Sequence, residues 1–281
     1  MVASAEVRKR TFDFTDKDFK ELGQIVHNRT GIVVSDAKKN MIYGRIVKRL
    51  RALNMDNFSD YILYIKSDAG DNEAIDFINA ITTNLTKFFR ENHHFEHLRD
   101  KVILPMVVNQ NPSKRVRLWS AGCSSGMEAY SMAITISEAV PNLVAWDFKI
   151  LATDIDTNML SKGENGIYRN KDLENIPSNL IKKYFKKYDD DNMIISEKLR
   201  NMVHFKRFNL LDSTWPMKGP FDVIFCRNVV IYFDSTTQSE LFRNYHKKLK
   251  PGGWFYIGHS ETLLDAADMY DSQGKTVFMR L

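Results

Sequence analysis

The sequence of 281 residues has few of the features that mark secreted, metal-binding or membrane proteins. It contains two cysteines, Cys123 and Cys226, and no cluster of cysteines and histidines with metal-ligand spacing. Two thiols fit a reducing compartment and do not suggest a disulfide framework. Apolar runs such as 229–233 are far shorter than the roughly 20 residues of a membrane span, and 1–10 lacks the apolar centre of a signal peptide. We therefore expect a cytoplasmic protein with no metal and no membrane insertion.

The sequence also lacks internal repeats and low-complexity segments, and its charge is only moderately unbalanced. With 40 Lys and Arg against 35 Asp and Glu, the formal net charge is +5. That excess favours an acidic partner, either nucleic acid or an acidic protein surface. The length is sufficient for one sizeable core and a smaller second domain.

The first third of the sequence is predicted to be helical. Thr15 and Asp18 have the spacing of a capping box, an apolar face follows them, and Gly31 marks the end of that helix. The same reasoning predicts three further helices, at about 36–53, 59–66 and 71–81.

From about residue 116 the pattern changes to short apolar runs that alternate with amphipathic segments. This alternation predicts an α/β fold, with a parallel sheet covered by helices on both faces. A charged segment at 182–205 interrupts the pattern and predicts a small insertion of two or three antiparallel strands. The expected strands are 116–119, 148–153, 221–226 and 254–257, and the expected helices are 128–139, 157–163 and 235–249.

Sheets of this kind bind ligands at the carboxyl ends of their strands. After the first strand, 121–126 (AGCSSG) forms a glycine-bearing turn, and a helix opens at Glu128. The dinucleotide fingerprint is not matched, because Ser124 and Met127 stand where it needs glycine, so the pattern weakens a nicotinamide interpretation. S-adenosylmethionine has no phosphate and demands less of such a turn. Taken alone, the turn is equally well explained as a purely structural one.

Polar side chains follow the next strands. Asp154 is placed to accept hydrogen bonds from ribose hydroxyls, whereas Asp156 is equally suited to cap the following helix. Arg227 and Asn228 follow a buried strand, where neither belongs in a core; a ligand pocket, a salt bridge or a turn would explain them. Asn209 would suit an adenine edge, or it forms an Asx turn.

The segment 83–91 (TNLTKFFRE) joins the helical and the α/β parts of the sequence. Its two phenylalanines are expected in the core. The polar residues Asn84, Thr86 and Arg90 are instead candidates for a cleft between the two parts, because ligand sites are common at such places.

With these segments in view, the chain resembles the CheR-type chemotaxis receptor (protein-glutamate) methyltransferases over nearly its whole length. The resemblance implies a Rossmann-like class I S-adenosylmethionine methyltransferase sheet, an N-terminal all-α domain and a small inserted β subdomain. It implies domains at 1–85 and 86–281, with the insertion at about 182–206. The matching strings are 83–91, 118–131 (LWSAGCSSGMEAYS), 152–156 (ATDID), 221–233 (FDVIFCRNVVIYF), 251–253 (PGG) and 258–261 (GHSE).

The same resemblance implies which residues form the site. The cofactor S-adenosyl-L-methionine, with S-adenosyl-L-homocysteine as product, is expected on the residues that end this paragraph. Arg90 and Tyr232 are expected to orient the reacting carboxylate. Family members commonly have Glu and Pro where this chain has Met127 and Ala129, but Glu128 is retained. The expected cofactor residues are Asn84, Thr86, Arg90, Gly122, Glu128, Asp154, Asn209, Leu210, Arg227 and Asn228.

A basic stretch at 38–51 contains no acidic residue. Such a run is usually a solvated helix face, but in the family the corresponding helix meets the acidic methylation region of the receptor's cytoplasmic helical bundle. No glycine lies between Phe185 and Phe205, where family members that bind a receptor's C-terminal tether peptide carry a longer Gly-containing loop. We therefore expect direct bundle recognition and no tether binding. The expected receptor-binding residues are Lys38, Lys39, Arg45, Lys48, Arg49 and Arg51.

The implied reaction is methyl transfer to receptor glutamates for adaptation in a bacterial cell. Two alternatives remain at this point: an RNA methyltransferase and a non-catalytic cofactor-binding signalling protein. The first would be expected to interleave exposed aromatic residues with its basic ones, which 38–51 does not do. The second would be expected to lose Arg90 or Tyr232, and both are present. We therefore expect a monomeric enzyme with no nucleic-acid partner.

Overall fold

A computed structural model describes residues 12–109 and 113–281 of the chain. The chain divides into two compact units, Met1–Thr82 and Thr83–Leu281. The expectation that 1–10 is not a signal peptide concerns residues outside the described ranges. Within those ranges, no helix combines the length and the apolar character that crossing a membrane requires.

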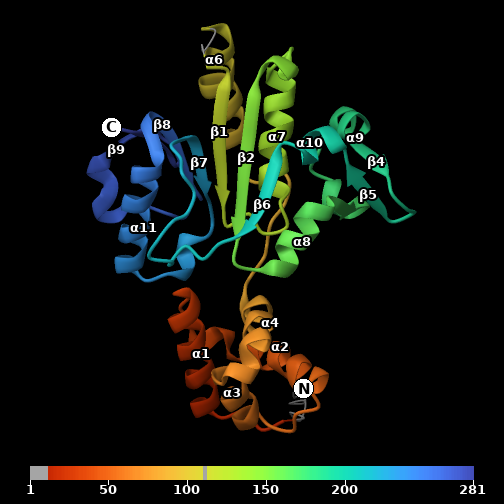
Figure 1. The fold of residues 1–281 in the computed structure, drawn as a ribbon, viewed down its shortest axis with the longest axis vertical. Helices are drawn as coiled ribbons and strands as arrows, with labels where there is room; N and C mark the ends of the chain where they lie inside the picture. The colour runs from red at the N-terminus through yellow and green to blue at the C-terminus, as the bar shows by residue number, and fades with distance from the viewer. Residues whose placement is uncertain (1–11, 110–112) are drawn as a thin grey trace, which may run out of the picture. The chain divides into compact units, whose positions relative to one another are not determined.

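The first unit is helical, as the sequence predicted (Figure 1). Helix α1 begins at the predicted capping box, in which the Thr15 side chain accepts from the Asp18 N–H and the Asp18 carboxylate accepts from the Thr15 N–H. It ends at Gly31, whose φ of 71° is left-handed. The predicted helix at 36–53 is a 3-10 turn, Asp36–Lys38, followed by α2. The α-helices are α1 (Asp16–Thr30), α2 (Lys39–Ala52), α3 (Phe58–Lys66) and α4 (Asp71–Ile81).

Two arginines of the basic stretch bind helix α4. One guanidinium nitrogen of Arg45 donates to the last two carbonyl groups of α4 and, at 2.7 Å, to that of Thr82, which follows the helix. Arg49 donates through Nε to the buried carboxylate of Glu73 at 2.9 Å and through Nη2 to Asp76 at 2.8 Å. Both arginines therefore hold α2 against α4, a role that the sequence alone did not indicate.

The second unit is built on a seven-stranded sheet with the order β6-β2-β1-β7-β8-β10-β9. Its first five strands are mutually parallel, and β10 runs antiparallel to both β8 and β9. The parallel arrangement confirms the predicted fold class and brings the carboxyl ends of β6, β2, β1 and β7 to one edge. The strands are β1 (Arg115–Ala121), β2 (Asp147–Asp154), β6 (Val203–Arg207), β7 (Phe221–Cys226), β8 (Leu249–Ile257), β9 (Tyr270–Ser272) and β10 (Val277–Arg280).

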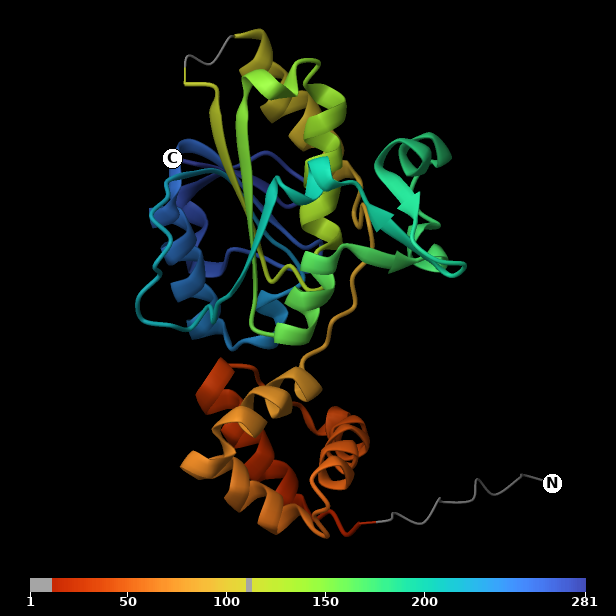
Figure 2. The same ribbon diagram turned by 45° about the vertical axis from the view of Figure 1, so that its right-hand side comes forward.

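Alternating side chains of the central strands fill two separate cores, one on each face of the sheet. Along β1, Val116 and Leu118 join the core under α7, whereas Trp119 and Ala121 join the core under α11. Figure 2 shows these two helices on opposite sides of the sheet. The helices are α5 (His93–His97), α6 (Leu104–Val108), α7 (Met127–Ala139), α8 (Thr157–Asn165), α9 (Ser178–Tyr184), α10 (Glu197–Arg200) and α11 (Ser235–Lys248), with a π-helical segment at Leu98–Ile103.

A small three-stranded sheet with the order β3-β5-β4 stands apart from the main sheet (Figure 2). Its strands are β3 (Ile167–Arg169), β4 (Phe185–Lys187) and β5 (Asn192–Ile195). The insertion therefore starts earlier than the predicted 182 and ends before β6, which pairs with β2 in the main sheet. The sequence could not place β3, because three residues are too few to show an alternating pattern.

We predict that Arg49→Ala destabilises the N-terminal unit by about 2–3 kcal/mol, because it leaves the buried Glu73 carboxylate without its cationic partner. Hydrogen exchange of the α2 and α4 amides would measure the change. The exposed Arg51 supplies the control, since Arg51→Ala should stay within about 0.5 kcal/mol of wild type. Equal protection in the two variants would contradict the structural role of Arg49.

Candidate functional site

The turn after β1 uses its own N–H groups within the protein. The N–H groups of Gly122 and Cys123 both donate to the carbonyl oxygen of Thr153, at 2.8 and 2.9 Å. The Ser124 N–H donates to Oδ2 of Asp154 at 2.7 Å. A phosphate would need such donors free. The turn therefore presents a carboxylate to a ligand, an arrangement that suits hydroxyl groups and cations better than phosphates.

The two acids after β2 have different roles. The Asp156 carboxylate caps α8 by accepting from the N–H groups of Asn158 and Met159, and its other oxygen accepts from Nδ2 of Asn84 at 2.7 Å. Asp154 stands beside the turn instead. Burial raises the pKa of Asp154 to about 6, although N–H groups of Asp156 and Ser124 partly oppose the rise. Of the pair, Asp154 is the candidate ribose ligand.

Glu128 lies in the first turn of α7, where the helix dipole favours a negative charge. Its Oε1 accepts from the Ser120 hydroxyl at 2.7 Å, and its Oε2 lies 3.3 Å from Nη1 of Arg227. Burial raises the pKa of Glu128, while Arg227 acts in the opposite direction. The carboxylate of Glu128 is thus held by two donors, the Ser120 hydroxyl and Arg227.

Arg227 is almost fully buried, with its guanidinium carbon 5.5 Å from the ring centre of Phe95 and 5.7 Å from that of Phe225. Its Nη2 donates to the backbone carbonyl of Arg90 and lies 3.2 Å from Oε2 of Glu91. The salt bridge that the sequence left open for Arg227 is therefore present.

Glu91 has no role in the sequence-based prediction, although it ends the matching string 83–91. Its Oε1 lies 3.0 Å from Nδ1 of His259 and 3.4 Å from Nδ2 of Asn228. Burial alone would raise the pKa of Glu91, but Arg227 and the hydrogen bond from His259 lower it to about 2. Glu91 therefore stays ionised at any physiological pH.

Glu261 is the second acid that sequence reasoning missed. Its carboxylate accepts the backbone N–H groups of Gly258, Asn228, Val229 and Val230. These bonds hold Asn228 at a φ of 58°, which is unusual for a residue other than glycine. The only signal in the sequence was its place at the end of the string GHSE.

The other predicted residues lie on neighbouring segments. Arg90 is partly buried and donates through Nη1 to the carbonyl oxygen of Leu85 at 2.8 Å. Asn209 accepts the Leu211 N–H at 3.1 Å, which is the Asx turn that the sequence left open. Of the rest, Thr86 is partly buried, Leu210 belongs to the core under α11, and Tyr232 ends the turn Val230–Tyr232 after β7.

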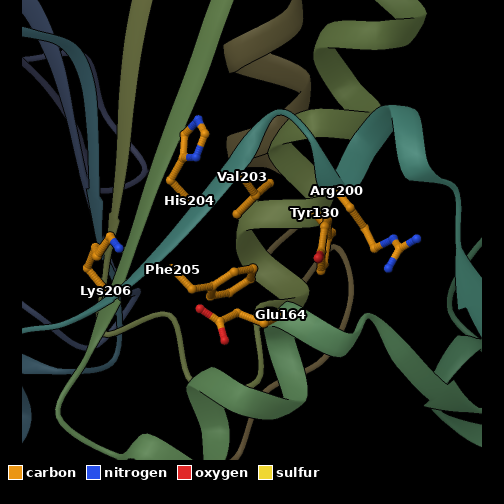
Figure 3. A pocket seen from close by; sticks show the side chains of 7 residues that line it. All are labelled: Tyr130, Glu164, Arg200, Val203, His204, Phe205 and Lys206. Atoms are coloured by element: carbon orange, nitrogen blue, oxygen red, sulfur yellow. The ribbon is translucent and has the colours of Figure 1, made fainter.

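Two hollows in the second unit are lined by other residues. One of about 220 Å³ follows the edge strand β6, where Figure 3 shows the Phe205 ring among its lining side chains. That ring fills the space beside Gly163, where an added Cβ would come within 2.4 Å of it. The other, of about 480 Å³, lies beside α7 and the segment 87–99. Neither is lined by a residue predicted for the site.

Comparison with known proteins decides the family. The family model described as CheR methyltransferase, all-alpha domain, matches residues 17–82, and the one described as CheR methyltransferase, SAM binding domain, matches residues 84–279. This chain belongs to the CheR methyltransferase family. The match confirms the resemblance inferred from the sequence strings and S-adenosylmethionine as the cofactor.

Three curated relatives illustrate how far the similarity extends. The chemotaxis protein methyltransferase of Salmonella typhimurium is 39% identical over 267 residues, which cover 94% of this chain and 90% of that protein. The Borreliella burgdorferi chemotaxis protein methyltransferase is 39% identical over 254 residues, covering 89% and 90%. Chemotaxis protein methyltransferase 2 of Pseudomonas aeruginosa is 38% identical over 270 residues, covering 95% and 94%.

The residues of this CheR-family chain fit such a cofactor. Two partly buried acids, Asp154 and Glu128, offer acceptors for hydroxyl and ammonium groups, and the turn's N–H groups are not directed at a phosphate. S-adenosylmethionine carries hydroxyls, an ammonium group and a sulfonium, and no phosphate. The assignment of individual residues to the cofactor remains a prediction.

We predict that Asp154→Asn weakens S-adenosylhomocysteine binding by about 10- to 100-fold, the loss expected for one or two charge-assisted hydrogen bonds. Wild-type affinity should also fall as the pH drops from 7 to 5, because Asp154 takes up a proton near pH 6 in the free protein. The variant should lose that decline. Calorimetric titration at several pH values measures both effects, with the exposed Asp190→Asn as control. A decline that persists in Asp154→Asn would assign the titration to another group.

Proposed function

We propose that this chain transfers the methyl group of S-adenosylmethionine to the side-chain carboxylate of glutamates in the cytoplasmic helical bundle of chemotaxis receptors. The products are glutamate methyl esters and S-adenosylhomocysteine. The observation that carries the proposal is the match to both CheR domains, together with two acids at the carboxyl edge of the sheet. Relatives named chemotaxis protein methyltransferase support the receptor as substrate.

The reaction requires mainly that the protein position the two reactants correctly. The cofactor supplies a positively charged sulfonium with an activated methyl group. A glutamate has an ordinary pKa of about 4.3, so its carboxylate is already ionised at neutral pH and no general base is needed. Because the reaction neutralises both charges, a site that excludes water favours it. Aligning the carboxylate with the methyl group lowers the activation barrier by several kcal/mol, up to about 7–11 in the best intramolecular cases.

In this proposal the cofactor is held by Asp154, Glu128, Asn209 and Leu210. The substrate carboxylate is oriented by Arg90 and Tyr232. Arg90 suits that task because its guanidinium is held by the Leu85 carbonyl while 28% of the side chain stays exposed. Tyr232 follows Asn228 in the turn that Glu261 fixes.

We predict that Arg90→Ala lowers turnover on receptor fragments by at least about tenfold, while S-adenosylhomocysteine affinity changes less. The reason is that the variant removes the cation proposed to orient the carboxylate and leaves Asp154 and Glu128 in place. Single-turnover rates and calorimetric affinities measure the two effects separately. The exposed Arg243→Ala, on α11, is the control. Unchanged turnover in Arg90→Ala would remove Arg90 from the mechanism.

The proposed receptor-binding surface is the basic face of α2. Lys48 and Arg51 are exposed on it, whereas Arg45 and Arg49 bind α4, and Lys39 pairs with Asp16. Lys38 is partly buried just before α2. The exposed pair therefore offers the cleanest test of electrostatic recognition, since changing Arg45 or Arg49 would also disturb the unit itself.

We predict that the double variant Lys48→Glu with Arg51→Glu raises the KM for receptor fragments about tenfold or more at low salt. The difference from wild type should shrink at high salt, because exposed charges are screened. Cofactor affinity should stay unchanged. Methylation rates across a salt series measure this, with the equally exposed Lys247→Glu on α11 as control. An unaltered KM would place recognition elsewhere.

The reaction itself is tested with cofactor carrying a labelled methyl group and receptor cytoplasmic fragments. Base treatment releases methyl esters as volatile methanol, whereas N-methyl and ribose methyl groups stay in place. Base-labile label on the fragment supports the proposal. Label that resists base, or that appears on added RNA instead, would overturn it. Fragments with and without a C-terminal tether peptide should be methylated alike, since the proposal assigns no role to a tether.

A further inference from the structure

One carboxylate links three separate segments of the second unit. Glu91 follows Arg90 in the segment before α5, and its oxygens approach Arg227 after β7 and His259 after β8. The same carboxylate also lies within 3.4 Å of the Asn228 amide. Two of these segments carry residues predicted for the site, Arg90 in the first and Arg227 in the second. This side chain thus connects all three segments.

The backbone around Glu91 is held in an uncommon conformation. Phe89 and Glu91 have φ values of 51° and 55°, in the left-handed region that residues other than glycine rarely adopt. Such conformations persist only where the surroundings enforce them. Here the Phe89 N–H donates to the Ser131 hydroxyl at 2.9 Å, and Arg227 donates to the carbonyl between them, that of Arg90. Arg227 therefore holds this segment both through the Glu91 side chain and through the Arg90 backbone.

The charges of this cluster depend on one another. Arg227 stands between the carboxylates of Glu91 and Glu128, at 3.2 and 3.3 Å, and its side chain is only 1% exposed. With Glu91 ionised, two carboxylates share the positive charge of the guanidinium. Without Glu91, the buried cation would have Glu128 as its nearest carboxylate partner, and the Arg90 backbone would lose its neighbouring anchor.

We propose that Glu91 is a positioning residue for methyl transfer, one that acts through Arg227 to hold Arg90 and Asn228 in the reactive arrangement. This inference rests on the proposed function. It adds that the alignment of the substrate carboxylate depends on a side chain that touches neither substrate nor cofactor.

The test compares Glu91→Gln with wild type on receptor fragments. Turnover should fall about 10- to 100-fold, because small misplacements of orienting groups are costly, while S-adenosylhomocysteine affinity should change less than about fivefold. The matched control is Glu96→Gln, five residues further on and exposed on α5. In an Arg227→Gln background, the further change Glu91→Gln should cost less than about threefold, since the two residues act as one unit.

Three results would overturn the proposal: unchanged turnover in Glu91→Gln, equal losses of turnover and affinity, or full additivity with Arg227→Gln. Should Glu91→Gln fail to fold, His259→Ala takes its place, because that ring is 69% exposed and only one link is lost. It should lower turnover severalfold at constant affinity, and unchanged turnover would again reject the idea. Inactive wild-type enzyme in the same assay would count against the proposed function and not against Glu91.

Discussion

The site of this protein depends on the burial of one guanidinium group. A charge taken out of water is costly unless it is paired and hydrogen-bonded. The two terminal nitrogens of Arg227 meet two carboxylates and one backbone carbonyl, and the guanidinium lies beside two aromatic rings. Its partners come from α7, from the segment before α5, from α5 and from β7. Satisfying this one cation therefore brings together the parts of the chain that carry the predicted ligands.

Much of the fold could be predicted because its elements show strong local periodicity. Helix α4 and strand β7 have the predicted bounds, Asp71–Ile81 and Phe221–Cys226. The sheet could be read as parallel because its strands are apolar on both faces, as the two cores under α7 and α11 require. The sequence-based prediction began the small sheet too late, because β3 has only three residues and its pairing with β5 depends on tertiary structure.

The candidate site was predictable only in part. Position after a strand singled out Asp154, Asp156, Arg227 and Asn228, but only the structure showed that Asp156 caps α8 while Asp154 faces the turn. Glu91 lies 168 positions from His259, and no spacing rule connects residues so far apart. The basic face of α2 was likewise predictable from the run of basic residues in the sequence. The contact between Arg49 and the buried Glu73 depends on the packing of α4 against α2, which the sequence does not show.

An enzyme that acts on carboxylates must admit an anion to a site lined with acids. Here each acid is already engaged by the protein: Asp154 by two backbone N–H groups, Glu128 by Ser120 and Arg227, and Glu261 by four backbone N–H groups. Donors that surround a carboxylate direct its field inward and weaken its repulsion of an approaching anion. Arg90, partly exposed at the same site, adds attraction. The acids of the site are thus compatible with an anionic substrate because their charge is bound within the fold.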